Sequence, residues 1–228
     1  MVDFILTDIE GTTTSVAFVY DTLFPYFSAH LPDFVDQHAD DVEVQAILAE
    51  TLTQPEAHDL EQTEEAVAAL IEWTKKDLKI PVLKKMQGLV WKNGYEEGQI
   101  KGHVYADVLP NLEKWQKQGC QFGIYSSGSV AAQKLLFGYS IFGDLRPFFS
   151  HYFDTAIGAK REENAYRRIQ NEIGRPAHQI LFLSDVEAEL DAARAAGMKT
   201  TQLVREGTVP SPKHPQALTF DDIQLDSN

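Results

Sequence analysis

The feature that most constrains the fold is a short apolar run near the start of the chain that ends at two carboxylates and a glycine. Residues 4–6 are apolar, Asp8 and Glu10 flank Ile9, and Gly11 follows. Such runs are typical of buried parallel strands, and open α/β sheets bind ligands beyond the carboxyl ends of these strands. Because side chains alternate along a strand, Asp8 and Glu10 point the same way. The run predicts either a shared acidic site or two ordinary polar residues that end a strand.

The rest of the chain divides into a helical part and an alternating part. Between the first strand and about residue 102, apolar residues recur at helical spacing, which predicts core-facing helices. The positions in two such stripes are Val67, Leu70, Ile71, Thr74 and Leu78, and Leu83, Met86 and Val90. From Tyr105 onward helices alternate with apolar strands, which predicts crossover units and a parallel sheet. The tail from Pro210 is predicted to be irregular.

These patterns predict an α/β fold class with a doubly wound parallel sheet of Rossmann type. Residues 1–16 and 103–228 form the predicted core, and residues 17–102 form an inserted helical domain. A chain of 228 residues is long enough for such a core with an insertion.

Polar residues follow three of the predicted strands. Asp8 and Glu10 follow the first, Ser126 and Ser127 follow the strand at 121–125, and Asp185 follows the strand at 179–183. Parallel strands bring these ends to one edge of the sheet. A hydroxyl at the start of a helix suits a phosphate, because backbone N–H groups and the helix dipole favour an anion there. Without a ligand, the same serines would be N-caps.

A carboxylate that approaches a phosphate needs cations nearby. Two like unit charges about 4 Å apart cost on the order of 4 kcal/mol at an effective dielectric constant of 20. Asp8 and Asp185 offer oxygen ligands for Mg²⁺, and Lys160 offers a second positive charge. Alone, Asp185 would be a helix cap and Lys160 a solvated charge. Together with the serines they predict a phosphoryl-transfer site.

Composition excludes several classes of partner. The formal net charge of -14 argues against binding to nucleic acid or to an anionic membrane surface. The single cysteine, Cys120, excludes an intrachain disulfide and a cysteine-based metal cluster, and it fits a reducing compartment. No apolar run approaches the roughly 18 residues of a membrane helix, and the chain lacks a leader pattern. We expect a cytoplasmic protein that acts as a monomer on a small phosphate ester.

The motifs also resemble those of a known family, the haloacid dehalogenase superfamily of phosphatases. The matching segments are Asp8–Thr12, the strand that ends at Ser126, Lys160, and Ser184–Asp185 with Glu189. Most of these phosphatases have aspartate as the second acid. Glu10 is instead similar to the variant in the enolase-phosphatases of methionine salvage, and residues 17–26, 88–108 and 125–137 match that family too. The segment from about 33 to 65 and the tail match only loosely.

The resemblance implies roles for the predicted residues. Asp8 would be the nucleophile that forms an aspartyl-phosphate, and Glu10 would protonate the leaving group and later deprotonate water. Lys160 would be the third catalytic residue, and Glu189 would position Lys160 or a water molecule. One Mg²⁺ per chain would be held by the carboxylates of Asp8 and Asp185 and the backbone carbonyl of Glu10. The residues implied to bind the phosphoryl group are Ser126, Ser127 and Lys160.

The family's substrate is 2,3-diketo-5-methylthiopentyl-1-phosphate, which is enolised and then dephosphorylated to an acireductone. The insertion would be a cap domain over the site. The aromatic residues Phe18, Tyr20 and Phe24 would either line a pocket for the methylthio end or belong to the core of the cap. The resemblance does not identify the base that enolises the substrate, for which Glu10 is one option.

Other functions remain open from the sequence. One is a phosphatase of the same superfamily that acts on a different ester without enolisation. A second is a phospho-accepting signalling domain, which Glu10 disfavours because it is placed to hydrolyse the phospho-aspartate. Dehalogenation is disfavoured as well, because Glu10 and Asp185 would have no evident role in displacing a halide.

Overall fold

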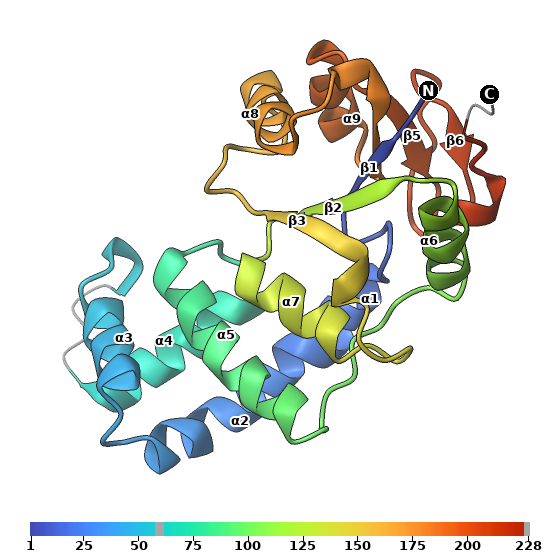
Figure 1. The fold of residues 1–228 in the computed structure, drawn as a ribbon. Helices are drawn as coiled ribbons and strands as arrows, with labels where there is room; N and C mark the ends of the chain where they lie inside the picture. Colours follow the sequence, from blue (N-terminus) through green and yellow to red (C-terminus); the bar gives the residue numbers. More distant parts are fainter. Residues whose placement is uncertain (58–61, 226–228) are drawn as a thin grey trace. The chain divides into compact units, whose positions relative to one another are not determined.

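The computed structural model describes residues 1–57 and 62–225, and its contacts divide the chain into two units (Figure 1). One comprises Met1–Val16 together with the chain from Lys101 onward, and we call it the α/β unit. The other comprises Ala17–Ile100, and we call it the helical unit. The predicted insertion at 17–102 includes residues 58–61, which lie outside the described residues.

The α/β unit is built on a parallel sheet in which β1 lies between β2 and β4. The strand order is β3-β2-β1-β4-β5-β6, and every neighbouring pair is parallel. The strands are β1 (Phe4–Thr7), β2 (Gln121–Tyr125), β3 (Phe149–Phe153), β4 (Ile180–Ser184), β5 (Lys199–Leu203) and β6 (Gln216–Ala217). Each residue of β1 and β4 is buried, as their apolar sequences require. The strand order reverses between β1 and β4, where sheets of this kind bind ligands.

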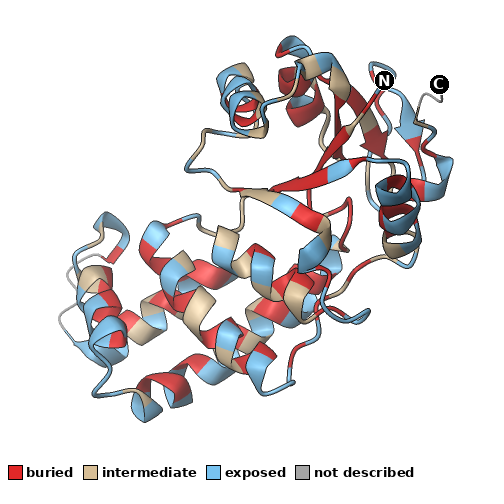
Figure 2. Ribbon diagram, viewed as in Figure 1, coloured by how far each residue is buried: buried red, intermediate tan, exposed pale blue. Residues whose placement is uncertain are grey.

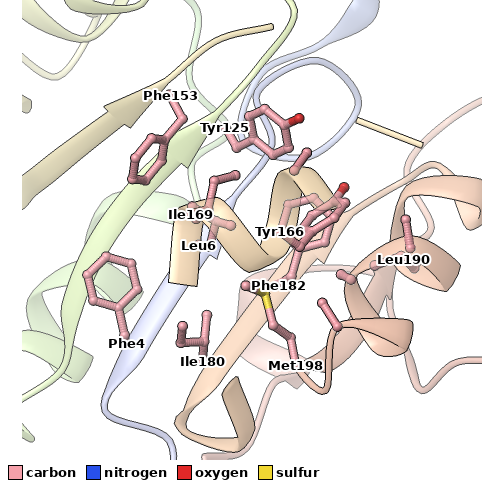
Figure 3. Close-up of a cluster of buried hydrophobic side chains, with 14 residues drawn as sticks. Phe4, Leu6, Tyr125, Phe153, Tyr166, Ile169, Ile180, Phe182, Leu190 and Met198 are labelled. Atoms are coloured by element: carbon pink, nitrogen blue, oxygen red, sulfur yellow. The ribbon is translucent and has the colours of Figure 1, made fainter. Parts of the chain in front are cut away.

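Four helices pack on this sheet, and they make it doubly wound. They are α6 (Val108–Lys117), α7 (Val130–Gly138), α8 (Glu163–Ile173) and α9 (Glu187–Ala195). Figure 1 shows α8 and α9 on one side of the strands and α6 on the other. Side chains of α8 and α9 form a buried cluster with β1, β2, β3 and β4 (Figure 3). The helix α8 ends at Gly174, whose φ of 70° provides a left-handed C-cap.

The prediction of an irregular tail is wrong for residues 216–217 and 220–222. The strand β6 extends the sheet beyond β5, and a single 3₁₀ turn spans Phe220–Asp222. Gln202 and Val204 of the β5 segment donate backbone hydrogen bonds to Pro215 and Ala217 at 2.8 Å each. A strand of two residues has no periodicity that a sequence pattern could reveal, because its position depends on the neighbouring edge. Residues 226–228 of the predicted tail lie outside the described residues.

The described residues of the helical unit form helices joined by turns and short loops, and the first helix begins at Val16, the residue just before this unit. They are α1 (Val16–Phe18), a π-helical turn (Val19–Leu23), α2 (Phe24–Gln37), α3 (Val42–Leu52), a 3₁₀ turn (Pro55–Ala57), α4 (Thr63–Lys75) and α5 (Pro81–Glu96). Figure 2 shows buried and exposed residues alternating along these helices, as amphipathic helices require.

The predicted apolar stripes of the helical unit are right for one helix and shifted for another. Leu83, Met86 and Val90 of α5 are buried as predicted. In α4, however, Val67 and Ile71 are only partly buried. The buried positions of α4 are Ala66, Leu70, Trp73 and Thr74. The core face of α4 therefore includes Ala66 and Trp73 in place of Val67 and Ile71, and Leu78 lies beyond the end of the helix.

Across the described part of the chain, no helix combines the length and the hydropathy that crossing a membrane would require.

Candidate active site

The first predicted site residue, Asp8, lies directly after the central strand β1. Its backbone N–H donates to the carbonyl of Leu183 at 2.9 Å, which places Asp8 level with the end of β4. The chain then turns sharply, because the N–H groups of Thr12, Thr13 and Thr14 all donate to the carbonyl of Ile9, at 3.2, 2.9 and 2.9 Å. Gly11 adopts a φ of 69°, which an L-residue rarely takes. We call residues 9–14 the β1 turn; it carries Glu10 and fixes its backbone.

Lys160 joins two carboxylates at the centre of the site. Its Nζ lies 2.6 Å from Oδ1 of Asp8 and 2.7 Å from Oε2 of Glu189. The side chains of all three residues are at most 10% exposed, so these charges interact with little screening by water. Ser184 donates its hydroxyl to the same Glu189 oxygen at 3.0 Å.

The electrostatics of this group keep the lysine charged. Burial disfavours the ammonium ion, but Asp8 and Glu189 outweigh burial and raise the pKa of Lys160 above its usual range. Burial and the Asp8 charge raise the pKa of Glu189, and the nearby Lys160 opposes this. The site therefore holds one buried cation between two acids, which leaves negative charge to be neutralised.

Asp185 begins the segment after β4 and faces the β1 turn. An added Cβ at Gly11 would overlap the Asp185 carboxylate, so only glycine leaves space at this point. Burial, together with the charge of Asp8, raises the pKa of Asp185 to about 6. Its Oδ1 is buried and accepts no hydrogen bond from the described residues. A buried carboxylate oxygen without a donor, close to a second carboxylate, is suited to a cation.

This arrangement fits Mg²⁺ held by few protein side chains. Among the described residues, no group of three or more His, Cys, Asp or Glu side chains is arranged to hold a metal ion. Two carboxylates and one backbone carbonyl, with water and phosphate oxygens completing the shell, do not require such a group.

The two predicted phosphate-binding serines lie at the end of β2. The Ser126 side chain is buried, and its Oγ accepts a hydrogen bond from the N–H of Gly128 at 3.2 Å. The Gln133 amide donates to the carbonyl of Gly128 at 2.8 Å and so holds this turn from α7. Ser127 is partly exposed at the start of the same turn. The structure therefore presents the turn at the same edge of the sheet as Asp8, because β1 and β2 are parallel and in register.

A buried arginine that no sequence pattern indicated holds the β1 turn. Arg205 forms an ion pair with Asp107, with Nη2 and Oδ2 2.7 Å apart, and its Nη2 also donates to the carbonyl of Thr12 at 3.2 Å. Its guanidinium lies 4.1 Å from the ring centroid of Tyr105. Asp107 in turn accepts from the N–H of Phe220 in the tail at 2.7 Å. Because Asp107 and Arg205 are 98 residues apart, no local pattern could have paired them.

Comparison with known proteins identifies the family of the chain. The family model for haloacid dehalogenase-like hydrolases matches residues 2–197, and the chain belongs to this class of enzymes. An Enolase-phosphatase E1 of Pseudomonas aeruginosa (strain UCBPP-PA14) is 52% identical over 222 residues, covering 97% of this chain and 98% of the relative. Another, from Methylococcus capsulatus, is 51% identical and covers 98% of each chain. Within the class, the chain belongs to the enolase-phosphatase family.

Solved structures give the same fold. The UTR4 protein of Saccharomyces cerevisiae is 39% identical with a TM-score of 0.83, covering 98% of this chain and 100% of that protein. CbbY of Rhodobacter sphaeroides is 16% identical with a TM-score of 0.62 over 97% of this chain and 96% of that one, and it shows the fold alone. The predicted fold class and family are thus confirmed.

Proposed function

We propose that this chain enolises 2,3-diketo-5-methylthiopentyl-1-phosphate and then dephosphorylates the enol to an acireductone in methionine salvage. Relatives of about 50% identity over nearly the whole chain are named enolase-phosphatases. The observation that carries the proposal is the contact between Lys160 and Asp8 at 2.6 Å, because it places a cation beside the carboxylate that would attack phosphorus. Glu10 lies two residues further on the β1 turn.

The chemistry follows from these three side chains. An oxygen of Asp8 attacks phosphorus, and the bond from phosphorus to the substrate oxygen breaks while Glu10 gives that oxygen a proton. Glu10 then takes a proton from water as the water oxygen attacks the phosphorus of the aspartyl-phosphate. Phosphate leaves, and the Asp8 carboxylate is restored. Lys160 neutralises negative charge on the transferring group throughout, and Ser126 and Ser127 bind its oxygens.

The site fits the Mg²⁺ that phosphatases of this superfamily generally use. The Asp8 carboxylate, the Glu10 carbonyl and the Asp185 carboxylate would hold it, which would provide the buried Asp185 Oδ1 with a partner. The bound cation supplies charge neutralisation and polarises oxygen atoms of the substrate. Because Glu10 contributes its backbone rather than its side chain, the Glu10 carboxyl stays available for proton transfer.

Several expectations remain predictions. We propose that the chain acts in the cytoplasm, which its single cysteine fits, and as a monomer, which its acidic composition permits. The role of the helical unit as a cap also remains a prediction. Phe18 is buried, whereas Tyr20 is 50% exposed and packs edge-on against Phe24 with centroids 5.4 Å apart.

A two-signal assay tests the proposed function. The diketone phosphate is supplied with Mg²⁺ or with excess chelator, and enol absorbance and released phosphate are followed together. We expect the enol signal to rise before phosphate appears, and both signals to disappear with the chelator. Phosphate release without an enol signal would favour a phosphatase of another ester. The absence of both signals with Mg²⁺ would contradict the proposal.

A further inference from the structure

Lys160 is held in place although it lies in a segment without regular secondary structure. Lys160 lies in the connection between β3 and α8, residues 154–162, which contains only turns and bends. We call this connection the lysine loop. A loop without regular structure is usually among the more mobile parts of a fold. Yet the Lys160 ammonium must lie within hydrogen-bonding distance of both Asp8 and Glu189. Something outside the loop must therefore fix its backbone.

Two buried tyrosine hydroxyls hold the backbone of the lysine loop. Tyr166 of α8 donates its hydroxyl to the carbonyl of Lys160 itself at 2.8 Å. Tyr125 at the end of β2 donates its hydroxyl to the carbonyl of Gly158 at 2.9 Å. The hydrogen bond from Tyr166 therefore restrains the backbone of Lys160, the residue whose side chain contacts Asp8 and Glu189.

The two tyrosine rings are themselves fixed by the core. Both residues are 0% exposed, and their rings pack edge to face with centroids 5.5 Å apart. The Tyr166 ring also packs edge to face on Phe182 of β4, at 5.1 Å. Figure 3 shows both hydroxyls at the same end of the buried cluster, away from Ile180 and Met198. A ring held on several sides keeps its hydroxyl in one place, since tyrosine has only two side-chain torsions.

The lysine loop also packs closely against α8 at Gly158. Gly158 adopts a φ of 147°, and a Cβ at this position would come within 2.8 Å of the Ala165 Cβ. The loop backbone therefore packs directly on the helix that carries Tyr166. The Lys160 Nζ lies 5.7 Å from the centroid of the Tyr125 ring, so this tyrosine contacts both the backbone and the charged end of the lysine segment.

We propose that Tyr166 and Tyr125 are positioning residues of the phosphoryl-transfer reaction, which aim Lys160 at the phosphoryl group by fixing the lysine loop. The inference rests on the proposed function, because it takes Lys160 to bind that group. The competing interpretation is that the hydroxyls only satisfy buried carbonyls and contribute to folding. The two interpretations differ in what the folded protein does after a hydroxyl is removed.

Tyrosine-to-phenylalanine variants separate them, because they remove one oxygen atom and keep the ring. Tyr166→Phe and Tyr125→Phe are compared with Tyr152→Phe as the matched control. The Tyr152 hydroxyl is also buried but donates to no partner among the described residues. Each variant is tested with Mg²⁺ for kcat, KM, thermal midpoint and the dissociation constant of inorganic phosphate, measured by calorimetry.

We expect Tyr166→Phe to weaken phosphate binding and lower kcat, each by about tenfold, in a protein that is still folded at the assay temperature. Tyr125→Phe should have a smaller effect of the same kind, because its partner is two residues from Lys160. Tyr152→Phe should match the wild type within about twofold. Wild-type kcat and phosphate affinity in both loop variants, whatever the thermal midpoint, would overturn the inference. If Tyr166→Phe does not fold, Tyr125→Phe decides.

A double variant tests whether the tyrosine acts through the lysine. If it does, the double variant Tyr166→Phe with Lys160→Ala should bind phosphate less than about twofold more weakly than Lys160→Ala alone. A further loss of phosphate affinity of about tenfold in the double variant would show that the hydroxyl does not act through Lys160, and it would overturn the inference. If wild-type protein releases no phosphate from the diketone phosphate, the proposed function fails. Phosphate affinity in these variants still tests the positioning role, so the two failures are distinguishable.

Discussion

Among the described residues, the α/β unit has exposed ion pairs and also two buried groups of charged side chains, whereas the ion pairs of the helical unit are exposed. In the α/β unit, the paired side chains of Lys160 and Asp8 are 9% and 7% exposed. In the helical unit, those of Lys85 and Glu50 are 53% and 40% exposed, although their charged atoms are only 2.8 Å apart. Two ion pairs of similar length thus differ in how strongly water screens them.

This difference indicates where the chemistry lies. Burial of a charge costs several kcal/mol unless partners compensate it, so a fold keeps such a group where it has a use or a complete set of partners. The α/β unit contains the Lys160 group and the pair of Arg205 with Asp107, whose side chains are 7% and 12% exposed. In the described part of the helical unit, the ion pairs of Lys75, Lys79, Lys85 and Lys92 lie at the surface. We therefore expect changes of charge to have large effects in the two buried groups of the α/β unit and small effects at the exposed pairs of the helical unit.

The largest expected effect follows removal of the Asp8 charge. Asp8→Asn should lower phosphate release by about 10⁴-fold, because the amide is not a nucleophile toward phosphorus. The matched change at an exposed acid of the helical unit, Asp33→Asn, should leave turnover unchanged. Steady-state phosphate release measures both variants, and circular dichroism checks their fold. Turnover of Asp8→Asn near the wild-type rate would remove the proposed nucleophile.

The next effect concerns Glu10, whose side chain and backbone have separate proposed roles. Glu10→Gln should lower turnover by about 10³-fold, because the amide cannot give or take the proton. Mg²⁺ affinity should change by less than about twofold, because the backbone carbonyl remains. Calorimetric titration with Mg²⁺ measures the affinity alongside turnover. A large loss of Mg²⁺ binding would show that the Glu10 carboxylate is itself a ligand.

Removal of the buried arginine should affect stability rather than chemistry alone. Arg205→Leu leaves the Asp107 carboxylate buried without its cation, which should lower the free energy of unfolding by about 3 kcal/mol. Urea denaturation followed by tryptophan fluorescence measures this change. The double variant Arg205→Leu with Asp107→Leu should recover part of the loss, because it removes the uncompensated charge. If Arg205→Leu is as stable as the wild type, the buried ion pair contributes no more to stability than an exposed one, and the comparison fails.

A smaller effect should appear with pH at His103. Burial and the charge of Arg205 lower the pKa of His103 below its ordinary value of 6.5, and its Nδ1 accepts from the N–H of Ser15 at 3.1 Å. The unfolded chain therefore binds this proton more readily, and stability falls as pH drops through this range. Urea denaturation at pH 7 and pH 5 measures how far the free energy of unfolding falls between the two pH values. This decrease should be smaller in His103→Gln than in the wild type. An equal loss in both would contradict this assignment.

The smallest effect is expected for the exposed pair of the helical unit. Lys85→Ala should change the free energy of unfolding by less than about 0.5 kcal/mol, because water screens its contact with Glu50. The same urea experiment measures it. A loss comparable to that of Arg205→Leu would show that exposed and buried pairs are equivalent here, and the comparison between the units would fail.

The sequence predicted the strand ends well because their signals are local. An apolar run that stops at Asp8 or at Asp185 marks both a strand and its carboxyl end, and parallel topology then brings these ends to one edge. The sequence could not predict that the Tyr166 hydroxyl reaches the Lys160 carbonyl. Tyr166 fits the apolar face of a predicted helix, and nothing in that pattern specifies where its hydroxyl points.

Contacts between distant segments account for the rest of what was missed. Arg205 and Asp107 belong to separate segments, and only the folded sheet brings them together with Thr12. The strand β6 exists because β5 offers an open edge, which its own two residues do not encode. Such features depend on tertiary context, whereas the site's principal acids are placed by strand and turn.

The measurement that tests the central claim most directly is chemical trapping of phosphate on Asp8. The Glu10→Gln variant is mixed with 4-nitrophenyl phosphate and Mg²⁺, because this leaving group departs without a proton. Hydrolysis of the acyl-phosphate is then slow, so it accumulates and borohydride reduces it to an alcohol. Peptide mapping should find homoserine at position 8, after a burst of about one nitrophenolate per chain. A burst of nitrophenolate with unmodified Asp8, or with the modification at another carboxylate, would contradict the account.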